Sequence, residues 1–149
     1  MGRAGFPIGW LTVALLVSTG GGVLAADPAG DRDRLQGEWR VVHRMSFNRQ
    51  QVVMKERASF TEDTFDLMGR SGAFVVDSAR QPKQLRHIVA PEAGGDPVTI
   101  HYIYMIDGDE LVLASKCGIA DNAARAGPPQ EFNAGLVEVI RLRRPPPAS

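Results

Sequence analysis

The feature that most constrains the fold is a segment in which a short polar stretch leads through a glycine into an alternating strand. From Asp31 to Val42 it reads DRDRLQGEWRVV. Gly37 is suited to turning the chain, because glycine accepts backbone conformations that other residues avoid. Trp39 then opens a run in which apolar and polar residues alternate. We therefore expect a helical turn, a change of direction at Gly37, and a strand whose tryptophan plugs the closed end of a β-barrel.

The strand that begins near Trp39 predicts which side chains face the interior. One of its faces is largely apolar and the other largely polar, with a period of two, which is typical of a half-buried strand. His43 is in phase with Trp39 and Val41, so the pattern points it toward the interior. There it would either line a ligand cavity or serve as a hydrogen-bonded core residue.

The chain continues as short strands separated by turn signals. The strongest strand, Val98 to Ile106, places Tyr102 and Tyr104 on one face. Gly108 lies in the sequence Asp-Gly-Asp-Glu that follows, which predicts a tight hairpin turn. Many short strands with such turns favour an antiparallel sandwich or barrel. The predicted fold is all-β, a small antiparallel barrel of about eight strands.

Residues 1–25 have the pattern of a signal peptide. Arg3 precedes an apolar run from Phe6 to Val17, and small residues lead to a cleavage site after Ala25. The run is shorter than the roughly 20 residues that a membrane-spanning helix needs, and an uncleaved anchor is the alternative. Cleavage would leave 124 residues, enough for one domain. We expect an exported protein, located in the periplasm, the cell envelope or the medium.

The rest of the chain is divided into three predicted segments. Residues 26–34 form a linker and a short helical turn, residues 35–144 the barrel domain, and residues 145–149 a proline-rich tail. The 17 basic and 17 acidic side chains give a formal net charge of zero, so no nucleic-acid partner is expected. Cys117 is the only cysteine, which excludes an internal disulfide. Its thiol is either reactive or engaged in an intermolecular disulfide, or it belongs to a half-buried residue at a strand end.

Several separated motifs together resemble one family, the small exported lipocalin-like domain of planctomycete bacteria, to which no function is assigned. The resemblance covers most of residues 31–144 in order. The matching motifs are LQGEWRVV (35–42), FVVD (74–77) before QPK (81–83), YMIDGDEL (104–111) and LRR (142–144). The resemblance implies a calycin-type barrel in which Trp39 packs beneath a late-strand arginine, Arg143 or Arg144. A guanidinium stacks favourably on an indole face, so this pair would have a structural role.

No motif indicates catalysis or a metal site. The three histidines lack the spacings of a local zinc site, and the chain has no nucleophile elbow, zincin motif or phosphate-binding loop. We therefore predict no catalytic residues, no metal and no cofactor, and we do not expect an enzyme. The candidates for ligand contact are His43, Tyr102 and Tyr104.

Two functions remain open at this point. The first is a monomeric module that binds a small apolar or amphipathic ligand inside the barrel, with no transmembrane segment after signal cleavage. The second is a structural or protein-interaction module of the cell envelope whose barrel is filled. The short mature length favours a packed or nearly packed interior. In either case the predicted structural residues are Gly37, Trp39, Gly108, Arg143 and Arg144.

Overall fold

A computed structural model describes residues 28–46, 49–51, 55–91, 93–116, 127–133 and 137–147. Within these residues one helix, α1 (Pro28–Leu35), precedes nine strands. The strands are β1 (Gly37–Ser46), β2 (Arg49–Gln51), β3 (Arg57–Thr61), β4 (Thr64–Leu67), β5 (Arg70–Asp77), β6 (Gln84–Val89), β7 (Val98–Asp107), β8 (Glu110–Lys116) and β9 (Val137–Arg143).

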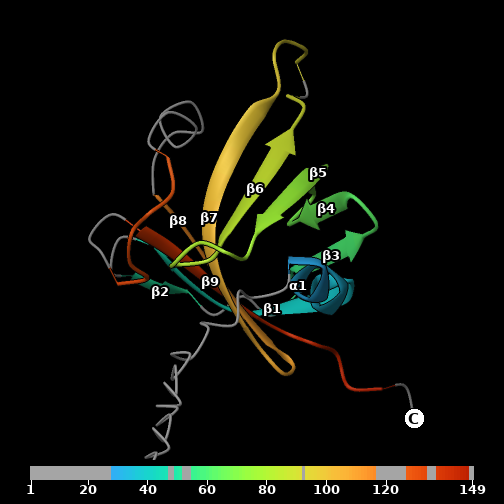
Figure 1. The fold of residues 1–149 in the computed structure, drawn as a ribbon, viewed down its shortest axis with the longest axis vertical. Helices are drawn as coiled ribbons and strands as arrows, with labels where there is room; N and C mark the ends of the chain where they lie inside the picture. Colours follow the sequence, from blue (N-terminus) through green and yellow to red (C-terminus); the bar gives the residue numbers. More distant parts are fainter. Residues whose placement is uncertain are drawn as a thin grey trace, which may run out of the picture.

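The strands form one closed antiparallel barrel (Figure 1). From β3 to β9 each strand pairs with the next along the chain, β1 pairs with β3, and β9 pairs back with β1. Eight strands therefore close an up-and-down barrel, an arrangement that leaves no free sheet edge. The short β2 pairs only with the end of β1. The predicted all-β barrel of about eight strands is confirmed. In the described part of the chain, no helix has the length and apolar character to span a membrane.

Aromatic side chains fill one half of the barrel interior. Phe60 and Phe65 stack with their ring centroids 4.1 Å apart, and Phe74 meets Phe60 edge to face at 5.1 Å. All three side chains are buried. Offset and edge-to-face contacts of this kind are the favoured arrangements of aromatic rings. This half of the barrel is a packed core.

Helix α1 and the residues after β9 cover the same end of the barrel, which we call the closed end. Trp39 is fully buried there, and its indole N–H donates a hydrogen bond of 2.8 Å to the carbonyl of Leu35. The guanidinium of Arg144 lies over the indole, 4.2 Å from the ring centroid. It also donates to the carbonyls of Gln36 and Arg34. Trp39 and Arg144 thus fasten the helix to the barrel.

Gly37, Arg143 and Gly108, which are also predicted to be structural, lie in three different environments. Gly37 has a φ of 106°, and a Cβ there would lie 3.3 Å from Nη1 of Arg144, so this position suits glycine on two grounds. Arg143 does not contact the tryptophan: it points outward and pairs with Glu110 at 2.5 Å. Gly108, with a φ of 54°, lies in the tight turn between β7 and β8.

A buried carboxylate also joins α1 to the barrel. Asp31 is 5% exposed and accepts hydrogen bonds from Nζ of Lys83 at 2.6 Å and from the hydroxyl of Tyr104 at 2.8 Å. Burial alone would raise the pKa of Asp31. The hydrogen bonds from Lys83 and Tyr104, and the positive charges of Lys83 and Arg34, outweigh burial and hold that pKa below its usual value. The carboxylate is therefore charged at neutral pH.

A β-bulge in β1 changes which side chains face the interior. Val41 pairs with Leu142 of β9, but the next pair is His43 with Arg141, so Val42 is an extra residue. An inserted residue reverses the faces of everything that follows it. The prediction that His43 faces the interior is therefore wrong, because the strict alternation ends at Val41.

A second, smaller core lies on the outside of the barrel. Ile103 and Ala114 are fully buried although they alternate with interior residues of β7 and β8. Val137 and Val139 of β9 belong to the same cluster, and Phe132 packs against it. The segment 127–133 thus covers part of the outer face of the sheet.

Candidate functional site

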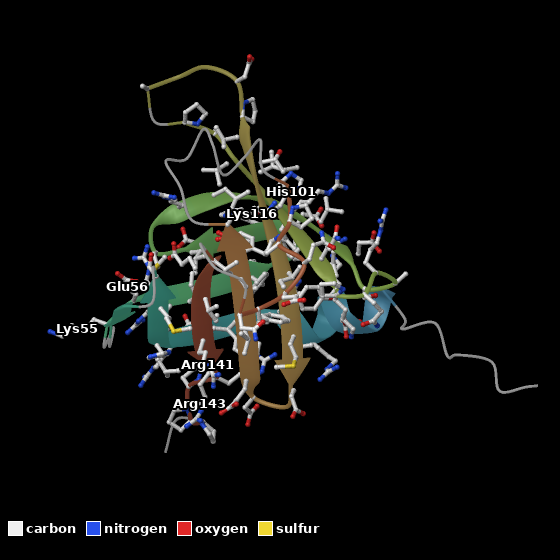
Figure 2. The ribbon with its side chains drawn as sticks, turned by 90° about the vertical axis from the view of Figure 1, so that its left-hand side faces the viewer. Lys55, Glu56, His101, Lys116, Arg141 and Arg143 are labelled. Carbon is white, nitrogen blue, oxygen red and sulfur yellow. The ribbon has the colours of Figure 1, made fainter. Side chains whose placement is uncertain are left out.

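The half of the barrel away from α1 holds a cavity of about 340 Å³, which we call the barrel cavity. Lys116, one of its lining residues, lies at the end of β8, and Figure 2 shows it well away from Arg143 near the closed end. Leu67, Ile100 and Ile140 form apolar walls. The other lining side chains are mostly polar or charged, so the cavity differs in character from the aromatic core beside it.

Strand register explains why polar groups collect in this half. Tyr102 lies opposite Ser115 on β8, and Ser115 lies opposite Glu138 on β9. Directly paired residues point to the same side of a sheet, so these three side chains share the inner face. His87 on β6 lies opposite Ile100, two residues before Tyr102. Two-residue spacing therefore places His87 on the inner face as well.

Arg44 enters this group because of the bulge in β1. It pairs in register with Ile140, a residue of the interior core, and its Nε lies 2.5 Å from Oε1 of Glu138. Both side chains are partly buried. A charged pair of this kind compensates the loss of hydration that each ion would otherwise suffer. The pair therefore contributes little net charge to the barrel cavity.

His87 is the most unusual residue of the site. It is 1% exposed, and neither Nδ1 nor Nε2 has a hydrogen-bond partner within the described structure. Its ring packs against Phe65, with centroids 4.6 Å apart. Burial lowers the pKa of His87 to about 4, and the nearby backbone of Phe65 and the charge of Asp66 oppose this shift only in part. At neutral pH the ring is uncharged, with one donor and one acceptor unused.

We expect the buried His87 to make folding stability depend on pH. The unfolded chain protonates this histidine near pH 6.5, whereas the folded protein resists protonation down to about pH 4. The unfolded state therefore binds more protons in this window, and stability falls as the pH drops. Between pH 7 and pH 5 the free energy of unfolding should decrease by about 2 kcal/mol on this account.

Chemical denaturation of the wild type and of His87→Leu at both pH values measures this contribution. His43 and His101 are present in both proteins, so the difference between the two pH dependences isolates His87. Equal losses of stability in the two proteins would show that His87 is not held in its neutral form.

Tyr102 and Ser115 supply two hydroxyl groups to the barrel cavity. Both side chains are less than 10% exposed, and neither hydroxyl has a hydrogen-bond partner among the described residues. Burial, and then the negative charge of Glu138, raise the pKa of Tyr102 well above its usual value. The Tyr102 hydroxyl therefore stays protonated and can donate a hydrogen bond to a ligand.

Two charged residues at the open end of the cavity lack partners. Arg70 begins β5 opposite Leu67, and its exposed side chain makes no ion pair or hydrogen bond with any described residue. Glu56 precedes β3, and its position is fixed because its carbonyl accepts a 3.0 Å hydrogen bond from the amide of Val41. Its Oε2 is buried without a partner in the described structure. One positive and one negative group are thus available to a ligand.

Of the three predicted ligand-contacting residues, only Tyr102 lines the barrel cavity. Tyr104 faces the closed end, where its hydroxyl binds Asp31. His43 lies on the outer face beside Met45, in a larger hollow of about 720 Å³ that Phe132 also lines. This hollow adjoins the outer core and shares no lining residue with the barrel cavity.

Sequence reasoning missed His87, although a signal for it was present. Leu85, His87 and Val89 are spaced by two, and His87 is separated from Leu85 by the charged Arg86. That alternation places His87 on the same face as the apolar Leu85. The contributions of Arg44 and Glu138 could not be found in this way, because alternation assigns charged residues to the solvent side.

The described residues contain no metal site, and comparison with known proteins does not indicate what the barrel cavity binds. Across the described ranges, no three His, Cys, Asp or Glu side chains are grouped in a way that could hold a metal ion. Cys117 and residues 1–25 lie outside the described residues. Comparison of the chain with family models, with curated proteins and with solved structures found no match.

Proposed function

We propose that this protein is a binding module that holds one small molecule in the barrel cavity. The observation that carries the proposal is His87, a fully buried histidine that lines this cavity with both ring nitrogens unpaired. Buried polar groups are nearly always hydrogen-bonded, and leaving one unpaired costs roughly 1–3 kcal/mol. A ligand that hydrogen-bonds to the ring would remove this cost.

The construction of the barrel supports binding in two further ways. The volume of about 340 Å³ is within the range of small-molecule sites. The packed aromatic core beside the cavity supplies rigidity, because Phe60, Phe65 and Phe74 hold the neighbouring strands together. The cavity walls therefore need not be ordered when the ligand binds, which lowers the entropic cost of association. The predicted signal peptide would place this binding outside the cytoplasm.

The polar lining of the barrel cavity disfavours a purely apolar ligand. An apolar ligand is one of the predicted classes, but such a ligand would leave His87, Tyr102 and the buried Oε2 of Glu56 unpaired. Burying unpaired polar or charged groups is costly. We therefore propose a polar or amphipathic ligand, with its apolar part against Leu67 and its polar groups against these side chains.

Native mass spectrometry of the protein purified from its own cells tests the proposal. We expect one bound small molecule per chain in the wild type. Ile100→Trp should abolish it, because the larger side chain fills the barrel cavity. Val75→Trp is the matched control, since Val75 lies on β5 and is 41% exposed on the outer face. Thermal unfolding of each variant establishes that it is folded, and Ser115→Leu provides a second, smaller obstruction.

Two outcomes would contradict the proposal. One is a wild-type protein that carries no small molecule and binds none from an extract of its own cells. The other is a folded Ile100→Trp variant that retains the same ligand as the wild type. Either result would favour the envelope module with a functional outer surface.

A further inference from the structure

The unpaired groups of the barrel cavity indicate what chemistry a ligand must bring. Building on the proposed binding function, we propose that the ligand is a small zwitterion of the α-amino acid class. Its carboxylate pairs with Arg70 and its ammonium group pairs with Glu56. His87 and Tyr102 bind the remaining polar groups, and the apolar walls receive its side chain.

Only two of the charged side chains that line the barrel cavity lack a partner among the described residues. Five charged side chains line the cavity. Arg44 and Glu138 neutralise each other, and Lys116 already has an interaction partner. The two that remain are Arg70, which is positive, and Glu56, which is negative. Arg70 is exposed and Glu56 is partly buried, so a ligand with both charges can pair with each of them, whereas a ligand with a single charge can pair with only one.

The topology places these two residues at the same end of the barrel. Arg70 lies opposite Leu67 on β4, and Leu67 lies opposite Ala58 on β3. Glu56 is two residues before Ala58, so it shares the inner face. It lies immediately before the first residue of β3. Both side chains line the barrel cavity and no ion pair joins them, so both charges are open to one ligand. A guanidinium is suited to bind a carboxylate with two parallel hydrogen bonds.

The uncharged lining residues and the cavity volume limit which zwitterion can bind. The neutral ring of His87 offers one donor and one acceptor, and the Tyr102 hydroxyl offers another donor. Leu67, Ile100 and Ile140 lie beside these groups. A cavity of about 340 Å³ is near the lower limit for small-molecule sites. A single amino acid or a dipeptide is of a suitable size, whereas a long acyl chain is not.

Isothermal titration with a series of L-α-amino acids of increasing side-chain size tests the inference. For the tightest binder, the analogues that lack the ammonium group or the carboxylate are titrated in parallel. For leucine these are 4-methylpentanoate and 3-methylbutylamine. We expect each analogue to bind at least tenfold more weakly, because a hydrogen bond to a charged group contributes about 1.5–3 kcal/mol and tenfold corresponds to about 1.4 kcal/mol.

Two variants assign each charge to its partner. Arg70→Gln should weaken the amino acid at least tenfold and leave the amine analogue unchanged. Glu56→Gln should weaken the amino acid and leave the carboxylate analogue unchanged. Arg86→Gln and Glu38→Gln are matched controls, because both residues are exposed on the outer face and lie outside the cavity. Both controls should retain the wild-type affinity.

The outcomes separate this inference from the proposed function. If native mass spectrometry finds a retained molecule that is displaced by Ile100→Trp, while no amino acid or dipeptide binds, the zwitterion inference is wrong and the binding function stands. Equal affinity for an amino acid and its two analogues would also overturn the inference. If no molecule is retained and none of the probes binds, the binding function itself fails.

Discussion

Replacing Trp39 with alanine should lower the free energy of unfolding by about 3 to 5 kcal/mol, the usual range for removing a large buried aromatic side chain. The indole is fully buried, donates to the Leu35 carbonyl at 2.8 Å and carries the Arg144 guanidinium on its face at 4.2 Å. The substitution removes these interactions and leaves a cavity at the closed end. Urea denaturation followed by circular dichroism measures the effect.

Trp39→Phe is the matched control for this experiment. Phenylalanine keeps an aromatic face for Arg144 but has no N–H, so the carbonyl of Leu35 loses its partner. We expect a smaller loss of about 1–3 kcal/mol. A change below about 0.5 kcal/mol for Trp39→Ala, typical of an ordinary surface position, would contradict the role of this tryptophan in closing the barrel.

Removing the Asp31 carboxylate should have the second largest effect. Asp31→Ala leaves the Lys83 ammonium and the buried Tyr104 hydroxyl without their acceptor, which lies 2.6 and 2.8 Å away in the wild type. Breaking a buried pair in this way costs about 3–5 kcal/mol. The Lys83 side chain is 26% exposed and regains some hydration, so we expect a loss near the lower limit, about 3 kcal/mol.

The pH dependence of this effect gives an independent check. The pKa of Asp31 is lower in the folded protein than its ordinary value of 3.8. Its stabilising contribution is therefore complete above about pH 4 and disappears as the pH falls through the folded-state pKa. The difference between wild type and Asp31→Ala should shrink in strong acid.

The matched control is Asp33→Ala, because Asp33 lies on the same helix and is exposed. Its substitution should change stability by less than about 0.5 kcal/mol. If the two variants were equally stable at pH 7, the contacts of Asp31 would not hold α1 on the barrel.

The fold could be predicted because most strands obey simple alternation. Tyr102, Tyr104 and Ile106 share the inner face of β7 as expected, since their strand has no irregularity. The bulge after Val41 has no comparable signal in the sequence, and one inserted residue was enough to place His43 on the outside. Alternation identifies faces but cannot detect a change of phase.

The candidate site was harder to predict for a different reason. Alternation placed Tyr102 and Tyr104 together, yet the first lines the barrel cavity and the second binds Asp31 at the closed end. A period of two identifies the inner face but carries no information about depth along the barrel axis. The ion pair between Arg44 and Glu138 joins residues far apart in the chain, so only the closure of β9 onto β1 brings them together.

The position of the closed end determines how the protein can be attached to a surface. Helix α1 begins the described domain there, and Arg144 anchors the segment that leaves it at the same end. A linker joined to either side of the domain would therefore start on the side facing away from the barrel cavity. Protein immobilised through such a linker on a bead or sensor surface should present its cavity outward, freely accessible to dissolved molecules.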